Sequence, residues 1–227
     1  MNASAAAAPG FIRHPLLSAV GPDHGFGTRS ASAPEGLARP RQVHGIAVAR
    51  VAADGRLDVE EADAAVSARP GVGLAIVTAD CVPILLATAS GTAVAAIHAG
   101  WRGLAAGVVE RGLAALGECA EEGDRIVAVI GPRIGPCCYE VDRPVMDPLR
   151  RRFGAELDRA SSVSRPGHFF LDLGRLVAQA LRRGGLRSED LALLSGACTA
   201  CEPARFHSHR RDGESAGRLL HYIVPNS

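Results

Sequence analysis

Two histidines and one cysteine stand at or beside the ends of apolar, strand-like segments of this 227-residue chain. His44 lies in "RQVHG", Cys81 in "TADC" and His98 in "AIHAGW". The ends of strands in a sheet bring together side chains that are distant in the sequence. Two imidazoles and one thiolate can hold a zinc ion with a fourth position open, as catalytic zinc sites do. The three residues therefore predict a catalytic metal centre.

The spacing of the three residues leaves a second interpretation open. The intervals of 37 and 17 residues match no local metal-binding motif. A single cysteine in a strand is commonly a small core residue. From spacing alone, each of the three side chains could equally serve packing.

The segments that must position these residues are short apolar runs with strand or helix patterns. Helices are expected over 103–118, 143–154 and 171–185, where apolar residues recur at helical spacing. Strands are expected within 44–53, 61–68, 71–80, 82–89, 91–100, 124–132, 190–197 and 219–225. Strands and helices mix without strict alternation. This favours an α+β fold with mixed sheets over a doubly wound fold.

The length suits one large domain or two small ones, and no internal repeat or long linker divides the chain. Residues 1–23 are rich in Ala, Pro and Gly, so we expect a poorly ordered N-terminal extension. Residues 24–227 are expected to form a single catalytic domain.

Composition argues against several classes of protein. The net charge is only +1, whereas nucleic-acid-binding proteins usually carry a basic surplus. Six Phe, two Tyr and one Trp offer few platforms for stacking bases. No apolar run is long enough for a membrane span, and the first residues lack the pattern of a secretory signal. We therefore expect a cytoplasmic protein with reduced cysteines, bound neither to nucleic acid nor to membranes.

The chain contains no lysine, so all 25 basic residues are arginines. Schiff-base catalysis and a P-loop lysine are thereby excluded. Any contact with an anionic substrate must come from arginine, histidine or backbone N–H groups.

A series of motifs resembles one known family. The chain carries, in this order, "QVHG", "TADCVPILL", "AAIHAGWRG", "IGPCCYEV", "FLDL" and "FHSHRRDGESAGR". Over residues 24–224 it is similar to the YfiH family, also called the laccase-domain or multicopper polyphenol oxidase family. The resemblance implies an α+β sandwich of mixed β-sheets flanked by helices. It also implies a mononuclear zinc site formed by His44, Cys81 and His98.

The resemblance further implies the chemistry of purine nucleosides. It suggests phosphorolysis of adenosine, inosine, guanosine and methylthioadenosine, together with deamination of adenosine. The expected partners are a purine nucleoside and phosphate. The protein itself is expected to be a monomer or a small homo-oligomer. Zinc is favoured over copper, because a multicopper enzyme needs many histidines in paired motifs. The one His-x-His pair here, His207 and His209, is far along the chain.

Further residues receive roles on this view. Asp80, beside the cysteine, is a candidate general base or partner of the ligands, or else a strand-end cap. Arg29, Arg210 and Arg211 are candidates for binding phosphate, since a guanidinium matches it bidentately. Gln42 could contact a base edge or pair within a strand.

Two other functions remain open from the residues. Cys81 could be the nucleophile of a metal-free amidohydrolase with His98 as its base, acting for example on peptidoglycan precursors. Toxin deamidases of similar fold use such a pair. The chain could also bind nucleosides without turnover, because only residues 30–41 separate "TR" from "QVHG", where the family usually carries some tens of residues.

The remaining cysteines are expected to be structural. "CTAC" at 198–201 has the spacing of a metal knuckle but lacks a second CxxC. "CC" at 137–138 follows a turn that could line the site.

Overall fold

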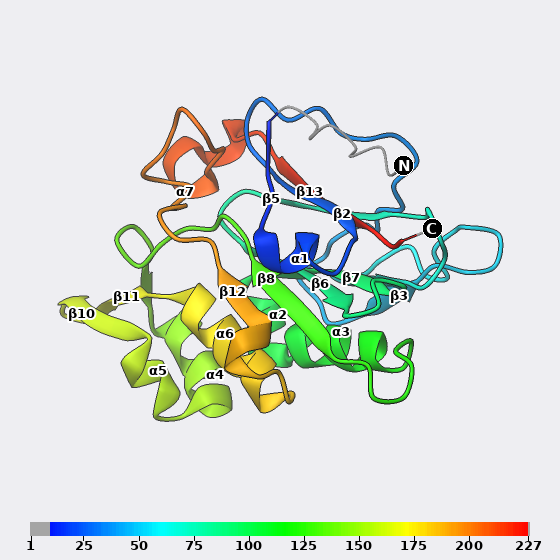
Figure 1. Ribbon diagram of the computed structural model, residues 1–227. Coiled ribbons are helices and arrows are strands. Elements are labelled where there is room, and N and C mark those ends of the chain that lie inside the picture. The colour runs from blue at the N-terminus through cyan, green and yellow to red at the C-terminus, as the bar shows by residue number, and fades with distance from the viewer. Residues whose placement is uncertain (1–9, 227) are drawn as a thin grey trace.

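Two β-sheets packed face to face form the centre of the computed structural model, which describes residues 10–226 (Figure 1). The four-stranded sheet is antiparallel throughout. Its order is β1 (Phe11–Ile12), β2 (Asp23–Gly27), β13 (Leu219–Val224), β5 (Leu74–Thr78). The six-stranded sheet is mixed, with parallel pairs at both edges. Its order is β12 (Leu191–Leu193), β8 (Ile126–Ile130), β6 (Val82–Thr88), β7 (Val94–Ala99), β4 (Ala64–Ser67), β3 (Val48–Arg50).

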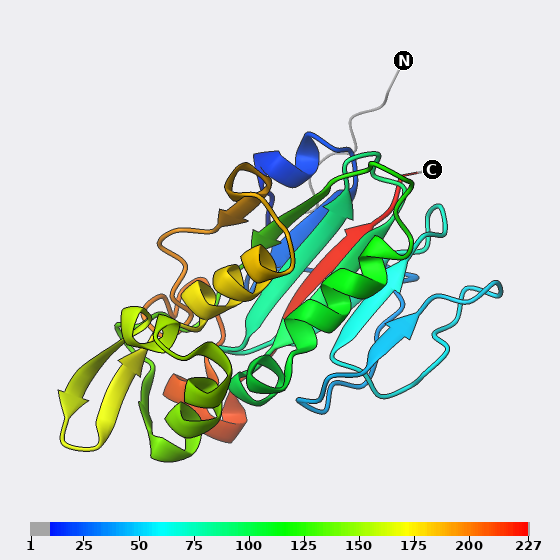
Figure 2. The same ribbon diagram turned by 90° about the horizontal axis from the view of Figure 1, so that it is seen from below.

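Helices cover the other face of the six-stranded sheet (Figure 2). They are α2 (Trp101–Ala106), α3 (Val108–Gly117), α4 (Arg143–Phe153), α5 (Glu156–Arg159) and α6 (Leu173–Arg183). A small antiparallel sheet, β10 (Ser161–Arg165), β11 (His168–Leu171) and β9 (Glu140–Asp142), projects beside α4 and α5. Short helices α1 (Pro15–Ser18) and α7 (His209–Asp212) lie near the four-stranded sheet. The predicted α+β class with mixed sheets is confirmed.

Alternation along β6 shows how one strand serves two cores. Ile84 and Leu86 pack against the helices, whereas Leu85 and Ala87 pack against the four-stranded sheet. Because successive side chains of a strand point to opposite faces, a strand buried on both sides must be apolar at every position. All seven residues of β6 are buried. This explains the uninterrupted apolar run in the sequence.

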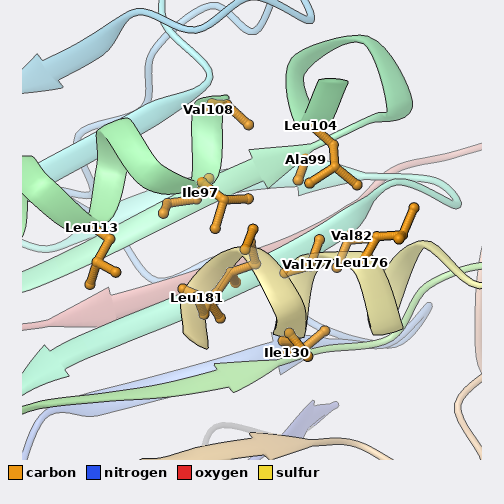
Figure 3. Close-up of a cluster of buried hydrophobic side chains, with 14 of the residues drawn as sticks. Val82, Ile97, Ala99, Leu104, Val108, Leu113, Ile130, Leu176, Val177 and Leu181 are labelled. Atoms are coloured by element: carbon orange, nitrogen blue, oxygen red, sulfur yellow. The ribbon is translucent and has the colours of Figure 1, made fainter. Parts of the chain in front are cut away.

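Helix α6 follows an amphipathic pattern. Asp172 caps its N-terminus by accepting a hydrogen bond from the Arg175 N–H at 3.0 Å. Its buried residues recur at helical spacing and lie over Val82 and Ile130 of the sheet (Figure 3). They include Leu173, Leu176, Val177, Ala180 and Leu181.

Two expectations about the elements are wrong. The N-terminal segment is structured from residue 10 onward, since it forms β1, α1 and the start of β2, and Leu17 is fully buried in the core. Residues 1–9 of the predicted extension lie outside the described residues. The helix expected over 103–118 is divided into α2 and α3 at Gly107, which has a φ of 101°.

None of the helices in residues 10–226 has both the length and the apolar character that a membrane crossing requires.

The break at Gly107 predicts a destabilising substitution. Gly107→Ala is expected to lower the free energy of unfolding by about 1–2 kcal/mol, because a Cβ is strained in the left-handed region. The added Cβ would also meet the Arg152 guanidinium at 2.8 Å. The matched control is Gly117→Ala, at a helical position with nothing within 4 Å, where no loss is expected. Denaturant titration of both variants measures the difference, and equal stabilities would contradict the strain argument.

Candidate metal centre

The structure brings His44, Cys81 and His98 together. One ligand atom from each lies within 4.8 Å of the other two. The Cys81 Sγ is 3.8 Å from the His44 Nε2, and the two imidazole centroids are 4.8 Å apart in an edge-to-face arrangement. A tetrahedral zinc with bonds of about 2.3 Å to sulfur and 2.0–2.1 Å to nitrogen separates such ligands by about 3.6 Å. The donor set and its spacing therefore fit one metal ion.

A β-hairpin accounts for two of the three positions. Strands β6 and β7 are antiparallel, with Val82 opposite Ala99 and Pro83 opposite His98. Cys81 directly precedes β6, and His98 is the penultimate residue of β7. The register therefore places them at the same end of the hairpin, although 17 residues separate them in the sequence.

Asp63 holds the loop that carries His44 and orients the His98 ring. Its carboxylate accepts hydrogen bonds from the backbone N–H groups of Val43 (3.2 Å), His44 (2.9 Å) and Gly45 (2.6 Å). It also accepts one from the His98 Nδ1 at 2.8 Å. This bond fixes the His98 tautomer, so that the Nε2 is the nitrogen left for a metal. Asp63 is fully buried. Asp63 was not among the predicted site residues, because its segment predicted only a strand.

Backbone strain gathers at the same place. Within residues 10–226, His44 (φ 59°) and Asp80 (φ 87°) are the non-glycine residues with positive φ. Such conformations cost free energy and persist where the surrounding contacts enforce them. The bond from the His44 N–H to Asp63 provides this enforcement at one position.

Asp80 is held by three segments of the chain. Its carboxylate accepts hydrogen bonds from the Thr199 hydroxyl at 2.5 Å and from the Arg210 N–H at 2.6 Å. Its carbonyl accepts one from the Ile134 N–H at 3.0 Å. Asp80 is buried, and both of its carboxylate oxygens are occupied by these contacts. The geometry supports its expected role as a partner that positions the adjacent Cys81, and gives no support to its acting as a general base.

Glycines allow α2 to approach the centre closely. A Cβ on Gly100 would lie 2.8 Å from the His44 ring and 3.2 Å from the Cys81 sulfur. A Cβ on Gly103 would lie 2.9 Å from the Gly45 carbonyl oxygen. The glycines of "HAGWRG" are therefore required by the packing of this helix against His44, Cys81 and the Gly45 backbone.

The electrostatics of the trio favour metal binding. Burial raises the pKa of Cys81, but hydrogen bonds and charge from His44 and His98 outweigh it and lower that pKa to about 6. Burial lowers the pKa of His98, but Asp63 and Cys81 outweigh it and raise that pKa to about 9. A thiolate beside imidazolium is thus already present near neutral pH. A bound cation would take the place of the His98 proton.

The trio opens into a cavity of about 740 Å³, a size that suits a small-molecule ligand. Among the described residues that line it, four are arginines and none is acidic. The four arginines are Arg39, Arg41, Arg102 and Arg218, and His209 also lines the cavity. None of these five was among the predicted site residues. Arg39 and Arg41 lie outside the quoted motifs, and Arg102, His209 and Arg218 lie inside them, but residue type alone does not show which members of a motif face a cavity.

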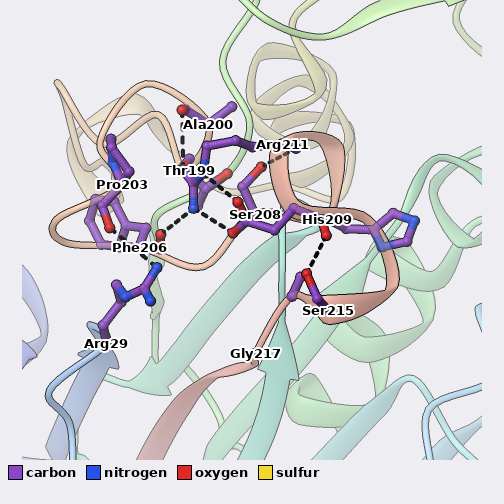
Figure 4. Close-up of polar contacts among 12 residues, drawn as sticks. Arg29, Thr199, Ala200, Pro203, Phe206, Ser208, His209, Arg211, Ser215 and Gly217 are labelled. Atoms are coloured by element: carbon purple, nitrogen blue, oxygen red, sulfur yellow. Dashed lines mark hydrogen bonds and ion pairs between the residues drawn. The ribbon is translucent and has the colours of Figure 1, made fainter.

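The arginines that were expected to bind phosphate are placed elsewhere. Arg29 donates a hydrogen bond to the Pro203 carbonyl at 3.3 Å, and Arg211 donates to three carbonyls of the 199–206 loop (Figure 4). Arg210 donates to the carbonyls of Cys138 and Glu140 and stacks over Tyr139. None of the three lines the cavity. Their guanidinium groups satisfy backbone carbonyls in loops, so the expectation of substrate contact finds no support here.

Gln42 lines the cavity but is also committed to the fold. Its side-chain amide donates to the Val77 carbonyl at 2.8 Å and accepts from the Val77 N–H at 2.7 Å. It thus pairs with the end of β5 as a strand residue would. Of the two interpretations of Gln42, the geometry favours pairing within the sheet.

These features define a class of proteins: an α+β sandwich with a His–Cys–His site at the end of a central β-hairpin. Residues 26–226 match the family described as "Multi-copper polyphenol oxidoreductase laccase". The chain belongs to this family.

The relatives support that assignment. A protein named "Purine nucleoside phosphorylase" from Xylella fastidiosa strain Temecula1 is 44% identical over 180 residues, which are 77% of this chain and 67% of that protein. A "Purine nucleoside phosphorylase" from Pseudomonas aeruginosa is 41% identical over 182 residues, 80% of this chain and 71% of that protein. The crystal structure of YlmD from Geobacillus stearothermophilus superposes with a TM-score of 0.83 at 29% identity, covering 97% of each chain.

The hydrogen bonds of Asp63 predict a loss of metal affinity. Asp63→Asn is expected to weaken zinc binding at the trio about 10–100-fold, because His98 loses its carboxylate partner and the His44 loop loses an acceptor. Competition with a chelator of known affinity measures the change. Asp58→Asn is the control, since Asp58 accepts the Arg50 N–H but contacts none of the trio. A folded Asp63→Asn protein with unchanged affinity would refute the role assigned to Asp63.

Proposed function

We propose that this chain is a zinc-dependent purine nucleoside phosphorylase that also deaminates adenosine. The observation that carries the proposal is the cavity onto which His44, Cys81 and His98 open, whose described lining residues include four arginines and no carboxylate. Such a lining suits an anionic co-substrate such as phosphate. The relatives named "Purine nucleoside phosphorylase" support the same activity.

The donor set favours zinc over copper. Two imidazoles and a thiolate also bind copper in electron-transfer sites, but there a thioether usually supplies a weak axial ligand. Met146 lies in α4 within the apolar core, and no methionine of residues 10–226 lines the cavity. A multicopper oxidase needs several histidine-rich centres. The other His/Cys cluster among the described residues contains only cysteines.

Arginine side chains would carry the recognition of phosphate. In phosphorolysis a phosphate oxygen bonds to C1′ of the ribose, the C1′–N bond breaks, and the purine leaves with the bonding electrons and takes up a proton. Arg39 and Arg102 can hold the phosphate through bidentate hydrogen bonds and partly neutralise its charge. Arg218 adds its positive charge, while its Nη1 donates to the carbonyls of Ala216 and Gly217. The Arg102 guanidinium is stacked 4.5 Å over the Trp101 ring, which restricts its orientation.

His209 is the proton-transfer group that the geometry offers. It lines the cavity, and its Nδ1 is 3.0 Å from the Gly213 carbonyl, to which it donates. The Nε2 is therefore the nitrogen that faces the substrate, and it can give a proton to the departing purine from the imidazolium form, which leaves the ring neutral with its hydrogen on Nδ1. Figure 4 shows the His209 side chain pointing away from the loop contacts around Thr199 and Arg211.

The three ligands would serve both reactions. Zinc bound by His44, Cys81 and His98 would supply Lewis acidity that orients phosphate or lowers the pKa of a water for attack at C6 of adenosine. The thiolate of Cys81 reduces the net charge of that centre. Asp63 keeps His98 oriented throughout.

A metal-free amidohydrolase is the alternative that one observation favours. The pKa of Cys81 is lowered to about 6 beside His98, which is the arrangement of a thiolate nucleophile and its acid–base partner. Amides of peptidoglycan precursors would be substrates for this chemistry. Sensitivity to chelators separates the two functions, because only the phosphorylase requires the metal.

Activity assays test the proposal directly. Zinc-loaded protein is expected to release adenine from adenosine with phosphate and inosine without it. Extensive treatment with a chelator should abolish both reactions, and zinc should restore them. Cys81→Ser is expected to lose at least 100-fold in turnover, whereas Cys119→Ser should retain it, since Cys119 bonds only within its own helix region and to Arg50. Zinc-loaded protein without either reaction, or activity that survives metal removal, would overturn the proposal.

The arginine-lined cavity predicts a specific kinetic effect. Arg39→Gln and Arg102→Gln are each expected to raise the KM for phosphate about tenfold or more, because a charge-assisted hydrogen bond contributes about 1.5–3 kcal/mol. The KM for the nucleoside should change less. Arg175→Gln, at an exposed position of α6, is the matched control. An unchanged KM for phosphate in both variants would argue against anion binding in this cavity.

A further inference from the structure

A second cluster of metal-ligating side chains lies outside the cavity. Cys137 and Cys138 belong to the loop between β8 and β9, and Cys198 and Cys201 belong to the loop between β12 and α7. The four sulfur atoms all lie within 4.8 Å of one another. The Cys201 sulfur is 3.4 Å from that of Cys137 and 3.2 Å from that of Cys138. Two loops 60 residues apart in the sequence thus bring four thiols to one point.

We propose that these four cysteines form a second metal site, which binds a single zinc ion through four thiolates. A tetrahedral ion with bonds of about 2.3 Å separates its sulfur ligands by about 3.8 Å, which lies between the 3.2 and 3.4 Å of the two Cys201 pairs and the 4.8 Å within which all four sulfurs fall. A disulfide needs about 2.05 Å, and all four cysteines are free. In an iron–sulfur cluster the cysteines bind different iron atoms, so their sulfur atoms lie further apart than the 4.8 Å within which all four sulfurs fall here.

The surrounding backbone is shaped for thiolate ligands. The Gly135 N–H donates a hydrogen bond to the Cys198 sulfur at 3.2 Å, a contact that stabilises negative charge on sulfur. A Cβ on Gly135 would lie 3.2 Å from the Cys137 sulfur, so a glycine leaves room beside the cluster. The Glu202 N–H bonds to the Cys198 carbonyl and closes the turn that holds Cys201. Cys137 and Cys201 are exposed, which gives an ion access from solvent.

The second site would stabilise the surroundings of the first. Its two loops are already joined by backbone hydrogen bonds between Arg133 and the segment 197–199. Ile134 from one loop and Thr199 from the other both bond to Asp80, which precedes the ligand Cys81. An ion that fixes both loops therefore fixes Asp80. The cluster does not line the cavity, so its role is structural and not catalytic.

Metal content of purified full-length variants tests this inference. The wild type is expected to hold two zinc ions per chain, Cys81→Ser one, Cys201→Ser one, and the double variant none. Cys119→Ser, the cysteine outside both clusters, should hold two. In cobalt-substituted protein, thiolate-to-cobalt absorption should fall strongly in Cys201→Ser and only slightly in Cys81→Ser.

A second measurement keeps the inference testable if Cys201→Ser does not fold. Chelation is expected to lower the thermal midpoint of Cys81→Ser, whose remaining ion would sit at the four cysteines. An unchanged midpoint would overturn the inference. A wild type that holds a single zinc, which Cys81→Ser removes, would also overturn it. So would fewer than six titratable thiols in the denatured, chelated wild type, or iron at the site in place of zinc. These results are independent of catalysis, so the proposed function can fail while this inference stands.

Discussion

The buried carboxylate of Asp63 is the constraint on which the site depends. A carboxylate enclosed by protein costs much free energy unless hydrogen bonds compensate it. Here three consecutive backbone N–H groups, of Val43 to Gly45, and the His98 imidazole supply those bonds. The same contacts force the positive φ of His44 and fix the His98 tautomer. One buried charge therefore determines the placement of two of the three ligands, and the β6–β7 hairpin determines the third.

Sequence could identify His44, Cys81 and His98, which the structure brings together, because their types are chemically distinctive and they lie beside recognisable apolar strands. It could not identify Asp63, since a single acid in an alanine-rich strand carries no periodic signal of its partners. The expected recognition of phosphate by Arg29, Arg210 and Arg211 stays a prediction that the geometry does not support, for a related reason. Arg210 and Arg211 lie in a conspicuous motif, but a guanidinium satisfies backbone carbonyls as readily as an anion. Only the fold shows which arginines meet at a cavity.

The fold was predictable where burial controls the residue types. Strands β5 to β8 were anticipated because they are buried and continuously apolar. Strand β10 was missed, because a partly exposed hairpin strand such as "SSVSR" has neither alternation nor an apolar run. The division between α2 and α3 was missed because helical periodicity continues across Gly107. In each case the decisive information is tertiary and not local.

The two clusters are connected through the second strained residue. Asp80 keeps its φ of 87° because three later segments of the chain, at Ile134, Thr199 and Arg210, donate hydrogen bonds to it. Two of those donors, Ile134 and Thr199, belong to the loops that carry the four cysteines. A strained residue holds its geometry only as well as its partners hold theirs. Since Asp80 directly precedes Cys81, the rigidity of the two cysteine loops determines how firmly the Cys81 side chain is held. The fold thus couples the four-cysteine cluster to the centre of His44, Cys81 and His98, although the two clusters have no side chain in common.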